Sequence, residues 1–235
     1  MDHPFSPPAL TTVPIAGSAQ RFPVRRVYCV GRNYEDHAKE MGFTGREPPF
    51  FFLKPADALL VVPAGETGAM PYPALTKNLH HEVELVVAIG TGGRNIAAVD
   101  AMRHVWGYAV GLDMTRRDLQ NDMKKQGRPW CIGKGFDHSA PIGSLVQASA
   151  AGDVTHAAIT LEVNGVVRQR STTDKLIWSI AETIEHLSAA WELQPGDLIF
   201  TGTPEGVGAV VAEDEMVASV AGLPELRVRV VQPVA

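Results

Sequence analysis

Cysteine and basic residues are scarce in this sequence, and each scarcity excludes a class of protein. The chain has 235 residues but 2 cysteines, Cys29 and Cys131. Two cysteines cannot form a disulfide framework, and their spacing fits no metal-ligand motif. The 21 Lys and Arg are outnumbered by 26 Asp and Glu, which gives a net charge of −5. Because the sequence has neither a basic excess nor a run of basic residues, we expect no nucleic-acid partner.

Long hydrophobic runs are missing as well. The longest stretch without a charged side chain, residues 3–20, contains four prolines and many polar residues. A membrane helix needs about 20 mainly apolar residues, so we expect no membrane partner. The sequence begins Met-Asp-His-Pro, without the basic and apolar regions of a secretory signal. We therefore expect a cytoplasmic protein with reduced cysteines.

Motifs that bind nucleotides or supply a serine nucleophile are also absent. The glycine-rich residues 90–95 follow a strand-like run, but they end in asparagine and no clear helix follows them. A dinucleotide-binding loop needs that helix, so we expect no dinucleotide site here. We also expect no organic cofactor. No Gly-x-Ser-x-Gly sequence is present, which argues against a serine hydrolase.

Short strand-like segments dominate the rest of the sequence. Asn164-Gly165 joins two of them and predicts a tight hairpin, because both residues tolerate positive φ. Strands and helices do not alternate regularly, so the expected fold class is α+β, β-rich and mixed. We expect a single domain over residues 24–235 and an irregular lead-in at residues 1–23. The remaining predicted strands lie at residues 24–30, 50–53, 59–62, 82–89, 108–112, 198–201 and 226–231.

Three helices are predicted from their start signals. Serine, threonine, asparagine and aspartate are preferred at helix N-termini, and a glutamate three residues later strengthens the signal. The expected helices are one from Asn33 to residue 41, one from Thr115 with Asp118 to residue 127, and one that starts at Ser179 with Glu182.

A group of carboxylates has the spacing of a metal site. Glu82 and Glu84 lie two residues apart in a strand-like segment, so their side chains share one face. Because like charges this close repel, they call for a cation, a shared proton or water, and oxygen ligands suit hard ions such as Mg²⁺, Mn²⁺ or Ca²⁺. Asp113, after the apolar run 105–112, is the candidate third ligand. The alternatives are a solvated acidic strand face and a helix-capping aspartate.

A histidine and a glutamate form a second candidate group. His37 and Glu40 lie three residues apart on the first predicted helix, and His37 falls on an apolar stripe of that helix. A carboxylate beside an imidazole fixes its tautomer and raises its basicity, as a general base requires. The alternative is a core histidine with a surface glutamate.

Two weaker candidates are a lysine and a glycine-rich loop. Lys134 lies between two glycines that leave its ammonium group accessible, although many surface lysines have such neighbours. Residues 201–208 could offer backbone N–H groups and a hydroxyl to a substrate carboxylate, or could be a simple turn.

The order of these motifs along the chain is more informative than any one of them. The series resembles the fumarylacetoacetate hydrolase family, and within it most of all the short acylpyruvate hydrolases, fumarylpyruvate hydrolases among them. The resemblance runs from about Val24 to the C-terminus. The motifs are VGRNYEDH at 30–37, FLKP at 52–55, LHHEVEL at 79–85, GLDMTRRDLQ at 111–120, Lys134, and residues 196–208.

The resemblance implies a fold, an assembly and a set of site residues. The fold is the mixed β-roll of the family's C-terminal domain, usually a homodimer. The family's metal ligands fall on Glu82, Glu84 and Asp113, and its ion is Mg²⁺ or Mn²⁺. The further positions that match are His37 and Glu40 as catalytic dyad, Lys134 as a catalytic lysine near the metal, and Arg117, Gln120, Thr203 and Lys54 as substrate-binding residues, with Arg32 a further candidate for the far carboxylate.

The activity implied is the metal-dependent hydrolysis of a carbon–carbon bond in a 2,4-diketo acid. Fumarylpyruvate, cleaved to pyruvate and fumarate in aromatic catabolism through gentisate, is the foremost expected substrate. Three alternatives remain open: an oxaloacetate decarboxylase or tautomerase, an isomerase of 2-hydroxyhepta-2,4-diene-1,7-dioate, and a metal-dependent binding protein without activity.

Overall fold

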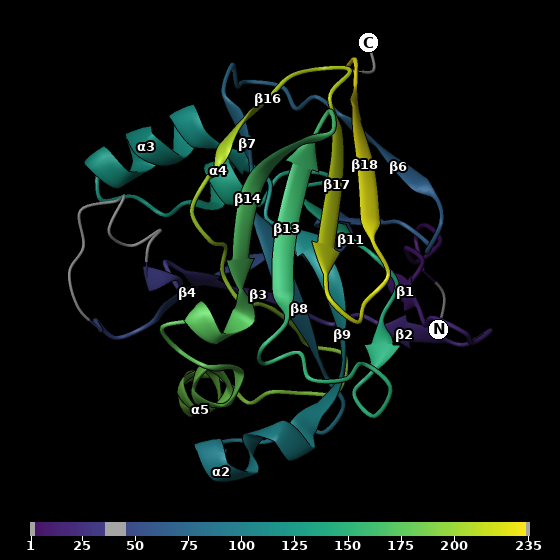
Figure 1. Ribbon diagram of the computed structural model, residues 1–235, viewed down its shortest axis with the longest axis vertical. Helices are drawn as coiled ribbons and strands as arrows, with labels where there is room; N and C mark the ends of the chain where they lie inside the picture. Colours follow the sequence, from purple (N-terminus) through teal and green to yellow (C-terminus); the bar gives the residue numbers. More distant parts are fainter. Residues whose placement is uncertain (1–2, 36–45, 234–235) are drawn as a thin grey trace.

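Two large β-sheets pack face to face in a computed structural model that describes residues 3–35 and 46–233 (Figure 1). The larger sheet has eight strands and contains both parallel and antiparallel pairs. Seven of its strands follow in the order β4 (Phe50–Lys54), β3 (Val27–Gly31), β15 (Leu198–Phe200), β8 (Val83–Ile89), β9 (Val105–Leu112), β11 (Ala140–Ile142) and β5 (Leu59–Val61), and β12 (Val146–Gln147) also pairs with β9.

The second large sheet covers one face of the first. Its five strands are in the order β14 (Val166–Thr172), β13 (Ala158–Val163), β17 (Glu215–Val220), β18 (Leu226–Val231) and β6 (Thr67–Pro71). Two small sheets complete the fold, one of β10 (Thr115–Arg116), β7 (Leu79–His81) and β16 (Gly208–Val210), the other of β1 (Thr12–Pro14) and β2 (Arg21–Pro23).

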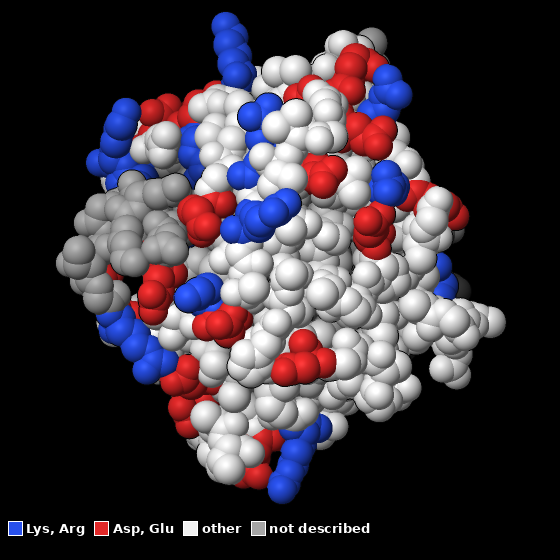
Figure 2. All heavy atoms as spheres, in the orientation of Figure 1, with Lys and Arg blue, Asp and Glu red and all other residues white. Residues whose placement is uncertain are grey.

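Helices are few and short in the described part of the chain, and no helix there is long and apolar enough to cross a membrane. The α-helices are α2 (Ala98–Ala101), α3 (Arg117–Lys125), α4 (Cys131–Lys134) and α5 (Ile180–Ala190); the 3-10 turns are η1 (Ala56–Ala58), η2 (Met102–His104) and η3 (Thr173–Lys175). The β-rich, mixed α+β fold predicted from the sequence is confirmed. On the face drawn in Figure 2, acidic and basic side chains are interspersed rather than gathered into a patch of one sign.

Strand β8 lies at the centre of the molecule, and all its residues are buried. Val83, Leu85 and Val87 pack in one core cluster with apolar residues of the five-stranded sheet, such as Leu161. Val86 and its neighbours on the opposite face join a second cluster. Burial on both faces explains the nearly continuous apolar run, because a strand with one solvated face alternates instead.

The hairpin turn and one of the helix N-termini predicted from the sequence are found in the structure. Asn164 and Gly165 adopt φ of 53° and 76° in the β13–β14 hairpin, so that prediction is confirmed. The capping box of Ser179 and Glu182 at the start of α5 is also confirmed. The predicted helix at residues 33–41 falls mostly outside the described residues.

The predicted capping box of Thr115 and Asp118 is wrong. The Thr115 hydroxyl donates to Asp113 O, and the Asp118 carboxylate accepts from the Thr76 hydroxyl and from Lys77 N. Thr115 therefore bonds to a backbone carbonyl two residues earlier, and Asp118 bonds to a segment distant in sequence. Helix α3 begins after Arg116 without a side-chain cap. Within the expected lead-in, Thr12–Pro14 and Arg21–Pro23 pair as the antiparallel β1–β2 ribbon.

Candidate active site

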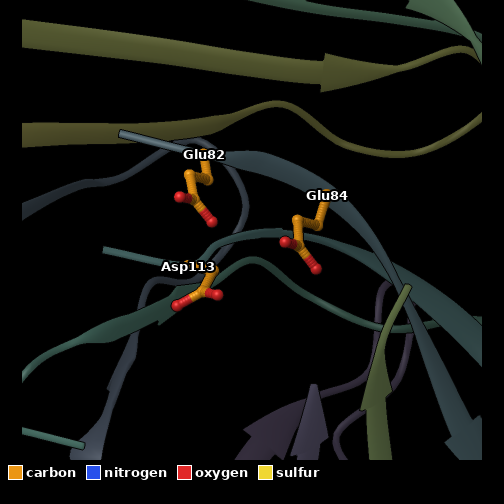
Figure 3. A group of neighbouring side chains, drawn as sticks. All are labelled: Glu82, Glu84 and Asp113. Atoms are coloured by element: carbon orange, nitrogen blue, oxygen red, sulfur yellow. The ribbon is translucent and has the colours of Figure 1, made fainter. Parts of the chain in front are cut away.

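Three carboxylates converge where the start of β8 lies beside the end of β9 (Figure 3). Glu82 precedes β8, Glu84 lies within it, and Asp113 follows β9, where Asp113 N donates to Glu82 O at 2.9 Å. One ligand atom from each residue lies within 4.8 Å of the others. The three residues are at most 5% exposed, so a solvated acidic face is excluded. Asp113 is not the cap of α3, because Arg116 holds that position.

Glu84 is buried beside two other carboxylates. Its Oε2 accepts a hydrogen bond from Gly202 N at 2.8 Å, and no ion pair of Glu84 is found among the described residues. Burial, followed by the charges of Asp113 and Glu82, raises the pKa of Glu84 well above its ordinary value. A divalent cation among the three carboxylates would offset this cost, and three oxygen donors suit a hard ion. The predicted oxygen-ligated cation site is therefore chemically sound.

Two buried lysines neutralise part of this acidic group. Lys134 Nζ lies 2.7 Å from both Glu82 Oε2 and Asp113 Oδ2, and Lys54 Nζ lies 2.8 Å from Asp113 Oδ1. Burial acts to lower the pKa of Lys134, but Asp113 and Glu82 outweigh it and raise the pKa, so this side chain is an ammonium at neutral pH. Lys54 also donates to the carbonyl oxygens of Met114 and Lys134.

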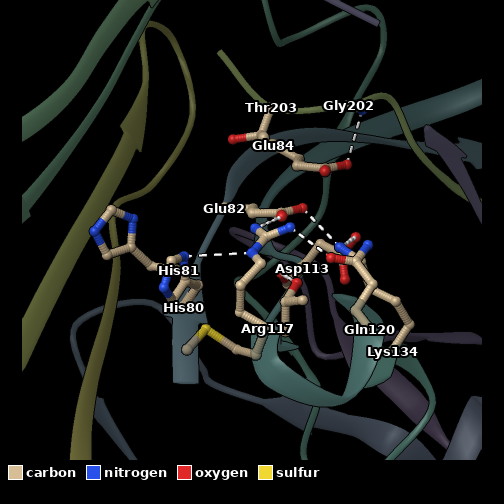
Figure 4. Close-up of polar contacts among 12 residues, drawn as sticks. His80, His81, Glu82, Glu84, Asp113, Arg117, Gln120, Lys134, Gly202 and Thr203 are labelled. Atoms are coloured by element: carbon tan, nitrogen blue, oxygen red, sulfur yellow. Dashed lines mark hydrogen bonds and ion pairs between the residues drawn. The ribbon is translucent and has the colours of Figure 1, made fainter. Parts of the chain in front are cut away.

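Arg117 contacts the acidic group from the first turn of α3 (Figure 4). Its guanidinium pairs with Glu82, donates to Gln120 Oε1 at 2.6 Å, and approaches His80 Nδ1 at 3.4 Å. Burial, then the charge of Arg117, lowers the pKa of His80 to about 4, so His80 is a neutral acceptor. His80 was missed in the sequence analysis, although two-residue spacing already places it on the face of Glu82 and Glu84.

The glycine-rich loop after β15 is held close to Glu84. Gly202 has φ of +102°, and a Cβ there would lie 2.7 Å from the Cβ of Asn33, so only glycine fits this close approach. The Asn33 side-chain amide donates to the carbonyl oxygen of Thr201, at the start of the loop, and to that of Trp178. These bonds hold the start of the loop in place. The loop thus directs a backbone N–H to a carboxylate of the protein, whereas the sequence suggested a substrate carboxylate.

One pocket brings most of the predicted site residues together. It is lined by Val30, Gly31, Arg32, Phe52, Glu82, Glu84, Asp113, Arg117, Gln120, Trp130, Lys134 and Thr203. Lys54 is absent from this lining because its fully buried ammonium lies behind Asp113. The guanidinium of Arg32, a lining residue, lies 5.0 Å from the centre of the Phe50 ring. His37 and Glu40 lie outside the described residues.

Comparisons with known proteins agree with this geometry. Rat (Rattus norvegicus) mitochondrial oxaloacetate tautomerase is 44% identical over 206 residues, which cover 88% of this chain and 91% of the rat protein. A fumarylpyruvate hydrolase from a Ralstonia species is 47% identical over 185 residues, 78% of this chain and 93% of that protein.

A solved structure is similar over nearly the whole length of both chains. Fumarylpyruvate hydrolase from Pseudomonas aeruginosa, crystallised with Mn²⁺ and pyruvate, is 61% identical, has a TM-score of 0.96, and is matched over 98% of this chain and 100% of its own. The family model described as "Fumarylacetoacetate (FAA) hydrolase C-terminal" matches residues 26–231. The chain therefore belongs to the fumarylacetoacetate hydrolase family.

Proposed function

We propose that the chain is a metal-dependent hydrolase that cleaves the carbon–carbon bond of acylpyruvates, with fumarylpyruvate as the foremost substrate and pyruvate and fumarate as products. The observation that carries the proposal is the buried triad of Glu82, Glu84 and Asp113, which shares one pocket with cationic and hydrogen-bonding side chains. The likeness to the fumarylpyruvate hydrolases from Pseudomonas aeruginosa and Ralstonia supports the choice of substrate.

The charge of the site supports a substrate with two carboxylates. The three acidic residues carry −3, and their partners Lys54, Lys134 and Arg117 carry +3, which sums to zero. A divalent ion brings the sum to +2. The guanidinium of Arg32, which also lines the pocket, adds a further positive charge. Fumarylpyruvate is a dianion and would offset two of these positive charges, whereas acetylpyruvate, with one negative charge, would offset one. Buried charge is costly unless it is compensated, so we expect the dianion to bind more tightly.

The proposed metal is Mg²⁺ or Mn²⁺, held by Glu82, Glu84 and Asp113, and no organic cofactor is proposed. When bound, such an ion supplies Lewis-acid stabilisation to negative charge that develops on neighbouring substrate oxygens. The protein side chains would provide the remaining steps.

The dyad would generate the nucleophile. In the proposed reaction His37, oriented by Glu40, removes a proton from water, and the resulting hydroxide adds to the C4 carbonyl carbon of the diketo acid. The C3–C4 bond then breaks, and its electron pair remains on the pyruvate part as an enolate. Lys134, an ammonium among carboxylates, would stabilise this charge or return a proton to C3.

The other polar side chains would orient the substrate. Gln120 accepts from Arg117 through Oε1, which leaves its amide nitrogen to donate elsewhere, and Gln120 and Thr203 both line the pocket. Arg32 and Arg117 are the proposed contacts for the far carboxylate, since they also line it. For Lys54 we propose instead a role in holding Asp113.

A product assay tests the proposal. Protein loaded with Mn²⁺ is supplied with fumarylpyruvate, acetylpyruvate or oxaloacetate, and the products are identified by chromatography. We expect equal amounts of pyruvate and fumarate from fumarylpyruvate, and slower release of pyruvate and acetate from acetylpyruvate. Absence of pyruvate from both diketo acids would overturn the proposal.

A second candidate is oxaloacetate tautomerase, which the 44% identity to the rat tautomerase favours. Both reactions use an enolate beside a divalent ion, but tautomerisation needs no attack by water. In the same assay a tautomerase would speed keto–enol interconversion of oxaloacetate without cleaving it, and a decarboxylase would release carbon dioxide. An isomerase would shift a double bond, and a binding protein would turn over none of the substrates.

We further propose that residues 24–235 act as one catalytic domain in a cytoplasmic homodimer, in the gentisate pathway of aromatic catabolism. The match of the family model to residues 26–231 supports the domain, and 2 cysteines in 235 residues agree with a reducing compartment. Light scattering on the purified protein tests the dimer.

A further inference from the structure

Gln169 lies on the five-stranded sheet, away from the pocket lining, yet it contacts two parts of the site. It is the one buried residue among positions 166–170 of β14, and it is 1% exposed. Its Oε1 lies 3.0 Å from both His81 Nδ1 and Val83 N, the two residues on either side of Glu82. Its Nε2 donates to Thr203 Oγ1 at 2.8 Å and to Pro204 O at 2.9 Å.

The orientation of this amide is fixed by chemistry. Val83 N–H can only donate and Pro204 O can only accept, so Oε1 must face the first and Nε2 the second. His81 must then donate from Nδ1 to the same Oε1. Thr203 Oγ1 must accept from Gln169, and its own hydroxyl hydrogen is therefore available to another acceptor. Thr203 lines the pocket, and Figure 4 places it beside Glu84.

We propose that Gln169 is a positioning residue with two separate halves: its amide nitrogen fixes Thr203 as a hydrogen-bond donor to the substrate, and its amide oxygen holds the chain around the metal ligand Glu82. The inference rests on the proposed function for the identity of the substrate. The arrangement itself connects the two large sheets across 86 residues of sequence, from Val83 to Gln169.

Two variants separate the halves. Gln169→Glu keeps an acceptor toward His81 and Val83, but it replaces the donor with a second acceptor, so the Thr203 hydroxyl must turn away from the pocket to donate to it. Gln169→Met removes both halves at similar volume. Gln147→Glu, which makes the same change at an exposed position of β12, is the matched control.

The readouts are Mn²⁺ affinity, and the affinity of the Mn²⁺-loaded protein for oxalate, a planar analogue of the pyruvate enolate, both by titration calorimetry. We expect Gln169→Glu to weaken oxalate binding about 10- to 100-fold while Mn²⁺ affinity changes less than about threefold. We expect Gln169→Met to weaken both, with the metal loss about tenfold or more. In the Thr203→Val background, Gln169→Glu should change the logarithm of the oxalate affinity by less than about a third of the change it causes in the wild-type background.

Three results would overturn the inference: oxalate affinity of Gln169→Glu equal to that of Gln147→Glu, an undiminished effect in the Thr203→Val background, or Mn²⁺ affinity unchanged in Gln169→Met. If Gln169→Glu does not fold, a double-mutant cycle of Gln169→Met and Thr203→Val, read out as oxalate affinity, tests the same coupling between Gln169 and Thr203. Neither readout needs turnover. A protein that binds oxalate but cleaves no acylpyruvate would refute the proposed function and leave this test intact.

Discussion

Replacing Lys54 by methionine separates a structural role from a substrate contact. The Lys54 ammonium is fully buried and lies 2.8 Å from Asp113 Oδ1, while the opposite oxygen of Asp113 pairs with Lys134. Removing one partner of a buried ion pair costs about 3–5 kcal/mol. Because Asp113 keeps Lys134, we expect the lower end, about 3 kcal/mol, which corresponds to a melting temperature about 6–12 °C lower for a chain of this size.

The same substitution should raise the affinity for Mn²⁺ and the stabilisation that Mn²⁺ gives. Without Lys54, the three carboxylates and two remaining cations sum to −1 instead of zero. A divalent ion then relieves more repulsion, so we expect Mn²⁺ to bind about tenfold more tightly, or by about 1.4 kcal/mol. At saturating Mn²⁺ the gap in stability between Lys54→Met and wild type should therefore narrow by about that amount.

Urea unfolding measures the unfolding free energy lost in Lys54→Met, and repeating it at saturating Mn²⁺ measures how far that loss narrows. Lys125→Met, at an exposed position of α3, is the control and should leave both unchanged. If Lys54 instead binds substrate, Lys54→Met will raise KM while its stability matches that of Lys125→Met. That result would refute the role assigned to Lys54.

Four further predictions follow from the same contacts. Glu84→Gln should abolish detectable Mn²⁺ binding by calorimetry, because it removes a buried ligand; retained affinity would contradict the triad. His37→Ala should lose pyruvate release from fumarylpyruvate but keep Mn²⁺ affinity within about threefold, and normal turnover would contradict its role as base. Ser179→Ala should cost about 0.5–2 kcal/mol of unfolding free energy through loss of the α5 cap, measured in urea. Hydrogen bonding from Arg46 lowers the pKa of Glu182 in the folded protein. The contribution of ionised Glu182 to the unfolding free energy is therefore full above the ordinary pKa of 4.5, and it is lost as the pH falls through the lower pKa of the folded state. The stability difference between wild type and Glu182→Gln should shrink at acid pH, and a constant difference would contradict this.

The strands and the acidic triad were predictable because their signals are local. Two-residue spacing placed Glu82 and Glu84 on one face, and the apolar run before Asp113 placed it at the end of a strand. The resemblance implied that Glu82, Glu84 and Asp113 hold one metal ion. The structure supplied the pairing of β8 with β9, which brings Asp113 beside Glu82.

The supporting contacts were not predictable, because they join residues far apart in sequence. Gln169 and His81 are separated by 88 positions, and Asn33 and Thr201 by 168. The sequence around Gln169 predicts a hairpin strand and says nothing of the opposite sheet. Thr115 and Asp118 fit a capping box by spacing, yet the Thr115 hydroxyl bonds to the nearby Asp113 carbonyl and the Asp118 carboxylate to Thr76, 42 positions away. Likewise, nothing near Lys54 indicates that its ammonium is directed at Asp113 rather than into the pocket.

The most direct test of the account is pyruvate release from fumarylpyruvate by chelator-stripped protein as Mn²⁺ is added back. The account predicts no release without metal, and a rate that rises to a plateau at one Mn²⁺ per chain, with no recovery in the Glu84→Gln variant. Full activity of the stripped protein would contradict it, as would recovery of Glu84→Gln at the same Mn²⁺ concentration as wild type.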